Sequence, residues 1–235
     1  ALPIAKYGGV AGGTQNAAIQ VSGATPSATR DTANFLYDGS SWTTTIPLNY
    51  GKYLGAGAGS VDAYLAYGLT PQPTKSEAFN GTSWSIQAGN ITPREAGSST
   101  GTVNAAIFAG GKAPAECTCT EEYNGSTWSA GGALGTARYW LAGAGSQTAT
   151  LVYGGRIVTG NIFSDLTEEY NGTTWSNSSA AIVGRNNLGS HQAGSQGSAL
   201  FVGGGTPGGN PAPGIVSDCT EEYSVTYVKT VSLSS

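Results

Sequence analysis

One short phrase occurs five times in this chain: an aromatic residue, a tight turn and, in four of the copies, a tryptophan. The copies read FLYDGSSWT, EAFNGTSWS, TEEYNGSTWS, TEEYNGTTWS and TEEYSVTYV. Their marker aromatics are Tyr37, Phe79, Tyr123, Tyr170 and Tyr223, which are 42, 44, 47 and 53 residues apart. This period favours the blades of a β-propeller over the repeats of a helical solenoid.

Each repeat has the same order of strand-like segments. An apolar run ending in glycine precedes every copy, at residues 16–23, 62–68, 104–111, 148–155 and 198–204. A Gly/Ala-rich segment such as YLGAGAGS precedes that run, and the phrase supplies one strand before its turn and one after it. Helical periodicity is missing. The sequence therefore predicts an all-β fold, a five-bladed β-propeller with four antiparallel strands per blade.

The repeat spacing also predicts the division of the chain. Residues 1–235 form one propeller domain, with blades at approximately 1–45, 46–88, 89–131, 132–179 and 180–235. We expect the Gly/Ala strands to lie innermost, where five strands around one axis leave room only for small side chains. Asn171-Gly172 and its equivalents supply the positive φ angles of two-residue hairpins between the third and fourth strands.

Four tryptophans recur at one position of the outer strand: Trp42, Trp84, Trp128 and Trp175. A repeated large ring is expected to cover the contact between neighbouring blades rather than to bind a ligand. The chain begins with a first strand and ends with a fourth, so we expect the ring to close by packing of the first blade on the last. The second-to-third loop lengthens in the last repeat, which predicts one variable face opposite a face of uniform turns.

Composition excludes several classes of protein. A net charge of −4 and a pI near 4.9 argue against a nucleic-acid partner. No segment approaches the roughly 20 apolar residues of a membrane span, so we expect no membrane insertion. Three cysteines, with Cys119 and Cys219 at equivalent places in different blades, favour an absence of disulfides.

Enzymatic chemistry has little support in the sequence. The single histidine, His191, excludes a multi-histidine metal site, and we expect no metal and no cofactor. The YDGSSW turn matches the Asp-box of sialidases only approximately, and no spacing marks an arginine cluster. We therefore predict a protein that is not an enzyme.

Acidic pairs recur at Glu121-Glu122, Glu168-Glu169 and Glu221-Glu222. Adjacent strand residues point to opposite faces, so each pair is unsuited to facing acid/base work. Basic residues recur as well: Lys6, Lys52, Arg94 and Arg138 each lie 11 residues before an alanine of the second strand, whereas Arg185 has an irregular spacing of 14. One reading makes this ring a set of structural ion pairs and carbonyl contacts between blades.

The other reading makes the same ring a ligand site on the variable face. Cations beside flat aromatic side chains suit sugars, through stacking and forked hydrogen bonds. The candidate binding residues are Lys6, Tyr7, Lys52, Tyr53, Arg94, Arg138, Tyr139 and Trp140. Trp140, the only tryptophan outside the repeat position, is the foremost candidate, although YWLAG also suits a plug of the ring.

The motifs AGAGSQTATLVYGG, TEEYNGTTWS and GGALGTAR resemble the kelch-like repeats of phage tail-fibre and other virion-surface proteins, over essentially the whole chain. The resemblance implies a virion-surface or extracellular adhesion module that binds a host-surface polysaccharide or protein. The alternative is a structural module that decorates a particle or fibre, contacts neighbouring virion or fibre proteins and binds no small ligand. An oligomer fits either reading.

Overall fold

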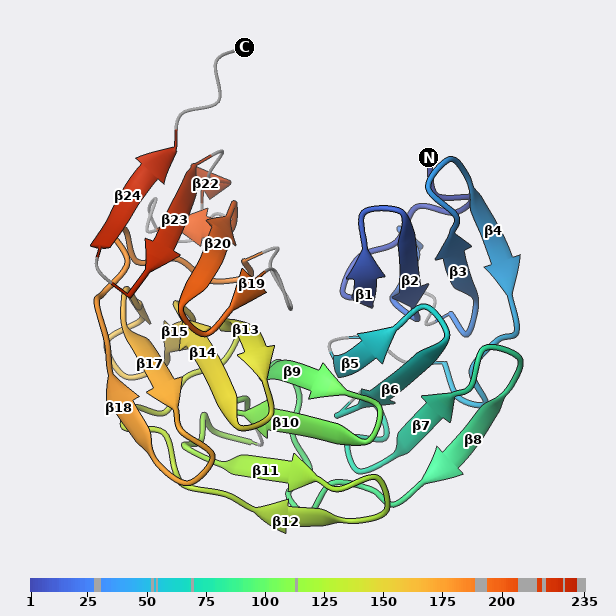
Figure 1. Cartoon of the computed structure of the whole chain (residues 1–235), viewed down its shortest axis with the longest axis horizontal. Coiled ribbons are helices and arrows are strands. Elements are labelled where there is room, and N and C mark those ends of the chain that lie inside the picture. Colours follow the sequence, from blue (N-terminus) through green and yellow to red (C-terminus); the bar gives the residue numbers. More distant parts are fainter. Residues whose placement is uncertain are drawn as a thin grey trace.

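The computed structural model describes residues 1–27, 31–51, 53, 55–68, 70–112, 114–188, 194–206, 215–216, 219–225 and 227–231. Five four-stranded antiparallel sheets follow one another along the chain (Figure 1). Blade one contains β1 (Val10–Thr14), β2 (Ala17–Val21), β3 (Asn34–Tyr37) and β4 (Trp42–Thr45). Blade two contains β5 (Ala56–Ser60), β6 (Ala63–Tyr67), β7 (Ser76–Phe79) and β8 (Trp84–Gln87). Blade three contains β9 (Ser98–Thr102), β10 (Ala105–Ala109), β11 (Thr120–Tyr123) and β12 (Trp128–Ala130).

Blade four contains β13 (Ala142–Ser146), β14 (Ala149–Tyr153), β17 (Thr167–Tyr170) and β18 (Trp175–Asn177). Blade five contains β19 (Gly194–Ser195), β20 (Ser198–Val202), β23 (Thr220–Ser224) and β24 (Tyr227–Val231). Two small hairpins complete the set, formed by β15 (Arg156–Ile157) with β16 (Ile162–Phe163) and by β21 (Gly205–Thr206) with β22 (Ile215–Val216). The described residues contain no helix, and so none long and apolar enough to span a membrane. The predicted five-bladed β-propeller is confirmed.

The innermost strands carry small residues because neighbouring backbones approach closely there. A Cβ atom added to Gly12 of β1 would lie 2.8 Å from the carbonyl oxygen of Gly59 in the next blade. The first three residues of β5, β9 and β13 are all buried, and each is Ala, Gly, Ser or Thr. The expectation about the Gly/Ala strands is therefore confirmed.

The third strand turns directly into the fourth, but the turn works differently from the prediction. Only the glycine has a positive φ, for example 90° at Gly125, and the asparagine before it does not. Asn124 instead uses its side-chain Oδ1 atom, which accepts the backbone N–H groups of Ser126 (3.0 Å) and Thr127 (2.9 Å). An aspartate does the same in blade one, because a carboxylate oxygen is an equally good acceptor.

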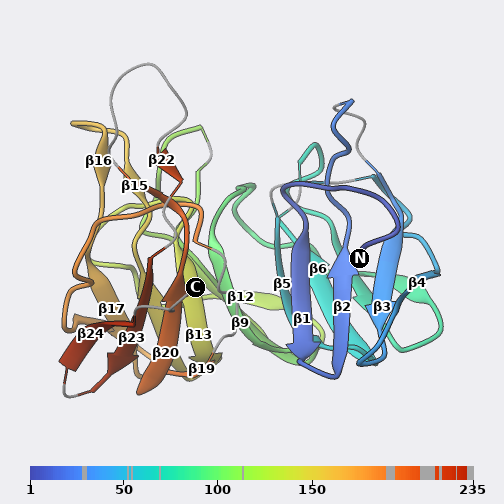
Figure 2. The ribbon, with the colours of Figure 1, turned by 90° about the horizontal axis from the view of Figure 1, so that it is seen from above.

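These turns all lie on one face of the propeller, next to the turns between first and second strands (Figure 2). On the opposite face, each connection between blades pairs with the loop after the second strand, as Tyr139 does with Arg156 and Glu95 with Lys112. We call this the loop face. The prediction of a variable face opposite a uniform one is confirmed.

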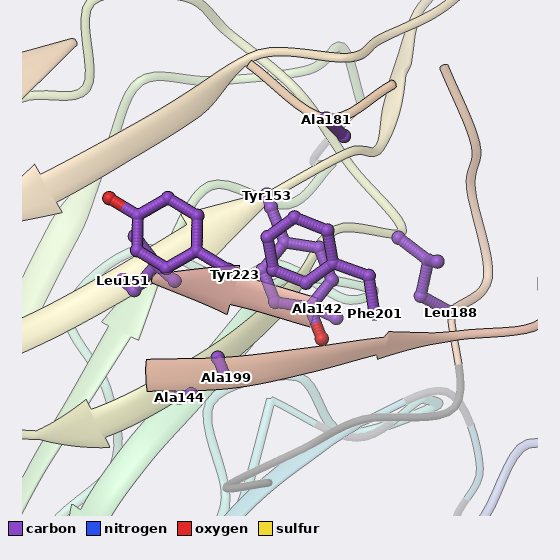
Figure 3. Packing of buried hydrophobic residues seen from close by; sticks show 9 residues of the cluster. All are labelled: Ala142, Ala144, Leu151, Tyr153, Ala181, Leu188, Ala199, Phe201 and Tyr223. Atoms are coloured by element: carbon purple, nitrogen blue, oxygen red, sulfur yellow. The ribbon is translucent and has the colours of Figure 1, made fainter. Parts of the chain in front are cut away.

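Blades pack on one another through apolar side chains between adjacent sheets. Figure 3 shows the contact of blades four and five, where Leu151 and Tyr153 meet Ala199, Phe201 and Tyr223. The tryptophans cover the outer part of such contacts, as expected. Trp84 and Trp128 are 9% and 8% exposed, and each indole N–H donates to a backbone carbonyl at the end of the preceding blade, 3.1 Å away.

The ring does not close, and the expectation that the first blade packs on the last is wrong. Figure 1 shows an open arc, with β1 to β4 and β19 to β24 on the two sides of the opening. The inner strands of successive blades contact one another from β1 to β19. Among the described residues, no hydrogen bond or ion pair joins residues 1–45 to residues 180–231.

Candidate functional site

Four of the recurring basic residues, those that the structure describes, have side chains buried inside the blades. The Arg138 side chain is fully buried, and its guanidinium donates to Glu168 Oε1 (2.6 Å), to the Gly154 carbonyl (2.7 Å) and to the Leu166 carbonyl (2.8 Å). Burial lowers the pKa of Arg138, and the Glu168 carboxylate opposes that shift. Arg94 pairs in the same way with Glu121, and Arg185 with Glu221.

The first glutamate of each acidic pair also holds the connection that enters its blade. Glu121, Glu168 and Glu221 accept backbone N–H groups from Ile91 (2.6 Å), Gly135 (2.7 Å) and Ile182 (2.7 Å) respectively. Each of these donors lies three residues before the paired arginine. Arg185 therefore belongs to the ring, and its irregular spacing reflects a longer segment before β20.

Blade one carries a variant of this unit because Phe35 stands at the glutamate position. The Lys6 ammonium lies 4.8 Å from the centre of the Phe35 ring and 3.3 Å from Asp31. Its side chain is 1% exposed, and burial lowers its pKa while Asp31 partly offsets the shift. An ion pair with Asp31 and a cation–π contact with Phe35 thus replace the arginine–glutamate pair in this blade.

This geometry shows that the expectation of ligand contacts from Lys6, Arg94 and Arg138 is wrong. Lys6, Arg94 and Arg138 are enclosed by their own blades, so a ligand on the loop face has no access to their charges. The structural reading of the ring is the right one, except that the ion pairs lie within blades rather than between them. Lys52 lies outside the described residues, as do Arg30 and His191.

In the first two pairs, the second glutamate serves the contact with the next blade. The Tyr170 hydroxyl donates to Glu122 of the preceding blade at 2.6 Å, and the Tyr223 hydroxyl donates to Glu169. Burial, together with the neighbouring carboxylate, raises the pKa of both tyrosines to about 12. The prediction that the two glutamates of a pair face opposite ways is confirmed.

The loop face has a hollow at the propeller axis, and residues of all five blades border it. Its volume is about 130 Å³, and it is lined by Gly8, Gly9, Gly55, Ala96, Gly97, Trp140, Leu141, Asn187 and Leu188. Equivalent residues of four blades have left-handed backbones here, with φ of 64° at Gly8, 58° at Ala96, 56° at Trp140 and 51° at Asn187. In each of these four blades, the repeat therefore places one residue beside the axis.

Trp140 stands out in this ring because a bulky residue rarely adopts a positive φ. Its N–H donates to the Ala96 carbonyl at 2.7 Å, and its carbonyl accepts the N–H of Asn187 at 3.0 Å. These bonds fix Trp140 between the two neighbouring blades. Its indole ring is partly exposed and lies 4.6 Å from the ring of buried Tyr139. Backbone strain of this kind is often concentrated at ligand sites.

The other aromatic candidates occupy one equivalent position around the axis. Tyr7, Tyr53 and Tyr139 each pair with the loop after the second strand, and Tyr7 and Tyr139 directly precede the axial residue of their blades. Tyr7 is 52% exposed, Tyr53 is partly exposed and Tyr139 is buried. The structure thus leaves Trp140, Tyr7 and Tyr53 at the surface of the loop face, whereas Tyr139 supports Trp140 from below.

A second hollow of about 240 Å³ lies off the axis on the same face, lined by Thr70, Pro73, Pro93, Arg94, Glu95, Lys112 and Pro114. The Lys112 ammonium lies 5.4 Å from the centre of the Tyr139 ring. Sequence reasoning missed Lys112 because a basic residue follows the second-strand glycines in only two repeats, as Lys112 and as Arg156. Its position in GGK, at the start of a variable loop, is the signal that marks it.

Exposed apolar side chains also gather on the loop face at the rim of blades four and five. The β15–β16 hairpin stands out from this face (Figure 2) and exposes Val158 (48%) and Ile162 (51%). Ile182 (53%) and Val183 (41%) lie in the adjacent connection, whose Gly184 packs against the carbonyl of Phe163. Within the described residues, no group of three or more acidic, histidine or cysteine side chains is placed to hold a metal.

The loop face therefore offers an aromatic centre, accessible cations such as Lys112 and Arg156, and an apolar rim, whereas Arg94, Arg138 and Arg185 are withdrawn into the blades. In comparisons with known proteins, neither a family model nor a curated protein matches the chain.

Proposed function

We propose that this propeller is a non-enzymatic, kelch-like binding module, displayed on a phage virion or on another extracellular structure, that recognises a host-surface glycan. The observation that carries the proposal is the placement of Trp140 at the axis, in a strained backbone held by both neighbouring blades. A partly exposed indole offers a flat apolar face to a pyranose ring, and the surrounding carbonyl and N–H groups suit hydroxyls.

The size of the axial hollow restricts how such a ligand binds. At about 130 Å³ it is smaller than the roughly 300–1,000 Å³ of sites that enclose a drug-sized molecule. A glycan would therefore lie across the loop face, with one sugar or substituent in the hollow against Trp140. Tyr7 and Tyr53 extend the contact outward along the chain of sugars.

Binding to a panel of bacterial surface polysaccharides tests the proposal, with the Trp140→Ala variant measured beside the wild type. Alanine is tolerated at this backbone position, since Ala96 occupies it in blade three with φ of 58°. Loss of a central aromatic contact is expected to weaken binding about tenfold or more, with thermal stability little changed.

Ile86→Ala is the matched control, because Ile86 is 56% exposed on the outer strand β8. This variant should bind like the wild type. The proposal fails if no polysaccharide binds, or if Trp140→Ala binds as tightly as the wild type.

A structural role in a particle or fibre is the second candidate function. It is favoured by the uncovered sheet faces of blades one and five, on the two sides of the open arc.

A further inference from the structure

The four contacts between blades share one pattern. Each blade has a forward face, turned to the next blade, and a rear face, turned to the preceding one. In blade four the forward face carries Leu151 and Tyr153, and Tyr153 stacks on Phe201 of the rear face of blade five with ring centres 3.6 Å apart (Figure 3). The Tyr153 hydroxyl also donates to the Leu200 carbonyl at 3.0 Å.

The forward face of blade five has no blade against it. Leu200 and Val202 hold the places of Leu151 and Tyr153, since they pair with Glu222 and Thr220 as those two pair with Glu169 and Thr167. Leu151 and Tyr153 are 0% and 1% exposed, whereas Leu200 and Val202 are 44% and 40% exposed. Adjacent Val225 is 69% exposed. A terminal repeat normally has a polar outer face, and this one is apolar.

The rear face of blade one is uncovered as well. Ala11 is exposed, whereas its equivalent Ser99 points at the preceding blade and donates to the Gly57 carbonyl at 2.7 Å. Trp42 and Tyr37 are partly exposed, although their equivalents Trp128 and Tyr123 are 8% and 1% exposed. This face thus keeps the residues that fit a preceding blade.

The Gln15 side chain indicates which hydrogen-bond acceptors such a preceding blade would have to provide. Its equivalent Gln147 donates from its side-chain amide to the Ala106 (2.9 Å) and Tyr123 (2.7 Å) carbonyls of blade three. Gln196 donates in the same way to the Thr150 (3.2 Å) and Tyr170 (2.6 Å) carbonyls of blade four. Gln15 is exposed. The matching acceptors for Gln15 are the carbonyls of Ala199 and Tyr223, which lie in blade five.

We propose that a second copy of this chain covers these surfaces, the rear face of its blade one packing on the forward face of blade five. The contact continues the forward-to-rear packing that joins the blades within one chain. Because the two surfaces differ, the contact is head-to-tail and leaves one free face at each end of the assembly. The inference does not depend on glycan binding, since the loop face takes no part in it.

Sedimentation velocity of the chain over a range of concentrations, without any glycan, tests the assembly. The wild type should form oligomers that grow with concentration. Val202→Glu blocks the forward face and Ala11→Glu blocks the rear face; both positions are exposed in the single chain, so thermal stability should hold. Each variant alone should associate at least tenfold more weakly than the wild type, because every pairing then buries a glutamate.

An equimolar mixture of the two variants gives the sharper result. Each copy keeps one intact face, so the mixture should yield a dimer of one Val202→Glu and one Ala11→Glu chain and nothing larger. Ile86→Glu, on the exposed outer strand β8, should assemble like the wild type. Gln15→Ala, which adds no charge, should weaken association several-fold.

A wild type that stays monomeric at all concentrations overturns the proposal. So does a mixture that yields no mixed dimer: closure of the arc within one chain predicts monomers, and symmetric pairing of identical faces predicts dimers of a variant with itself. Neither outcome bears on the Trp140→Ala test, so the two proposals fail separately.

Discussion

At the residue scale, the buried Arg–Glu pairs carry a large desolvation cost. Desolvating two charges is offset only when each charge is fully hydrogen-bonded. Arg138 meets most of that demand with one carboxylate and two carbonyls, although its buried Nε–H has no partner among the described residues, and Glu168 accepts the N–H of Gly135 as well. The pair thus ties together the inner connection, the second-strand glycine and the third strand of one blade.

Arg138→Ala should lower the free energy of unfolding by about 3–5 kcal/mol, because Glu168 is left as an unpaired buried charge. Urea denaturation of the variant and wild type measures the difference. Arg156→Ala is the control, since Arg156 is partly exposed and bonds to exposed Asn161, and it should cost less than about 1 kcal/mol. Equal losses in the two variants would show that the buried pair has no special role.

At the element scale, the outer strands of blades two, three and four are attached to the preceding blade by their tryptophans. Trp128 packs on Tyr67 of blade two with ring centres 4.7 Å apart, and its N–H bonds to the Ala88 carbonyl. No blade packs on the rear face of blade one in this structure (Figure 1), and its Trp42 contacts chiefly Tyr37 of its own sheet, at 5.1 Å. Tryptophan at this register position therefore packs against the preceding blade in blade three, whereas in blade one it packs within its own sheet.

Trp128→Ala should destabilise the protein by about 3–5 kcal/mol, the usual cost of removing a large buried ring. Trp42→Ala, made at a low protein concentration where chains are single, should cost about 1 kcal/mol or less. Thermal or urea unfolding of the two variants provides the comparison. A loss at Trp42 as large as that at Trp128 would mean that blade one is covered even in the single chain.

At the scale of the whole molecule, tyrosines link the blades and make the fold sensitive to alkali. Burial raises the pKa of Tyr64, Tyr67, Tyr123, Tyr153, Tyr170 and Tyr223. Several of these hydroxyls bond to an adjacent blade, as Tyr67 does to the Ile107 carbonyl and Tyr153 to the Leu200 carbonyl. Phenolate formation would place a charge between two apolar sheets.

Stability should therefore fall as the pH rises past the unfolded tyrosine value of 10.0. Above that pH the unfolded chain loses phenolic protons that the folded chain keeps, so the unfolded state binds fewer protons and ionisation favours unfolding. The lowered pKa of Lys6 acts in the opposite direction but involves a single group. Urea midpoints measured from about pH 8 to pH 11 test this, and a midpoint that stays constant over that range would contradict it.

Much of this architecture is local, which is why the sequence predicts it. A repeat of 42 to 53 residues with Gly/Ala, apolar, acidic-aromatic and tryptophan segments specifies four strands and their order. Alternation along a strand places the two glutamates of a pair on opposite faces. Of the binding candidates, the sequence marked Trp140 and Tyr7, which remain at the surface, but it also marked Lys6, Arg94 and Arg138, which do not. In the sequence, a basic residue beside an aromatic one looks the same whether it lies at a surface site or in a buried ion pair.

The sequence by itself thus determined the strands, the blades, the loop face and the opposite face that carries the uniform turns, because each depends on residues close together in the chain. Tertiary structure alone decided which charges are enclosed, since Arg138 and Glu168 are 30 residues apart and meet only when the blade forms. It also decided that the arc stays open. The angle between blades comes from side chains packed across each contact, and small differences in that angle add up over five blades. No sequence motif indicates the total angle through which the blades turn. The uncovered faces of blades one and five are therefore visible only in the folded molecule.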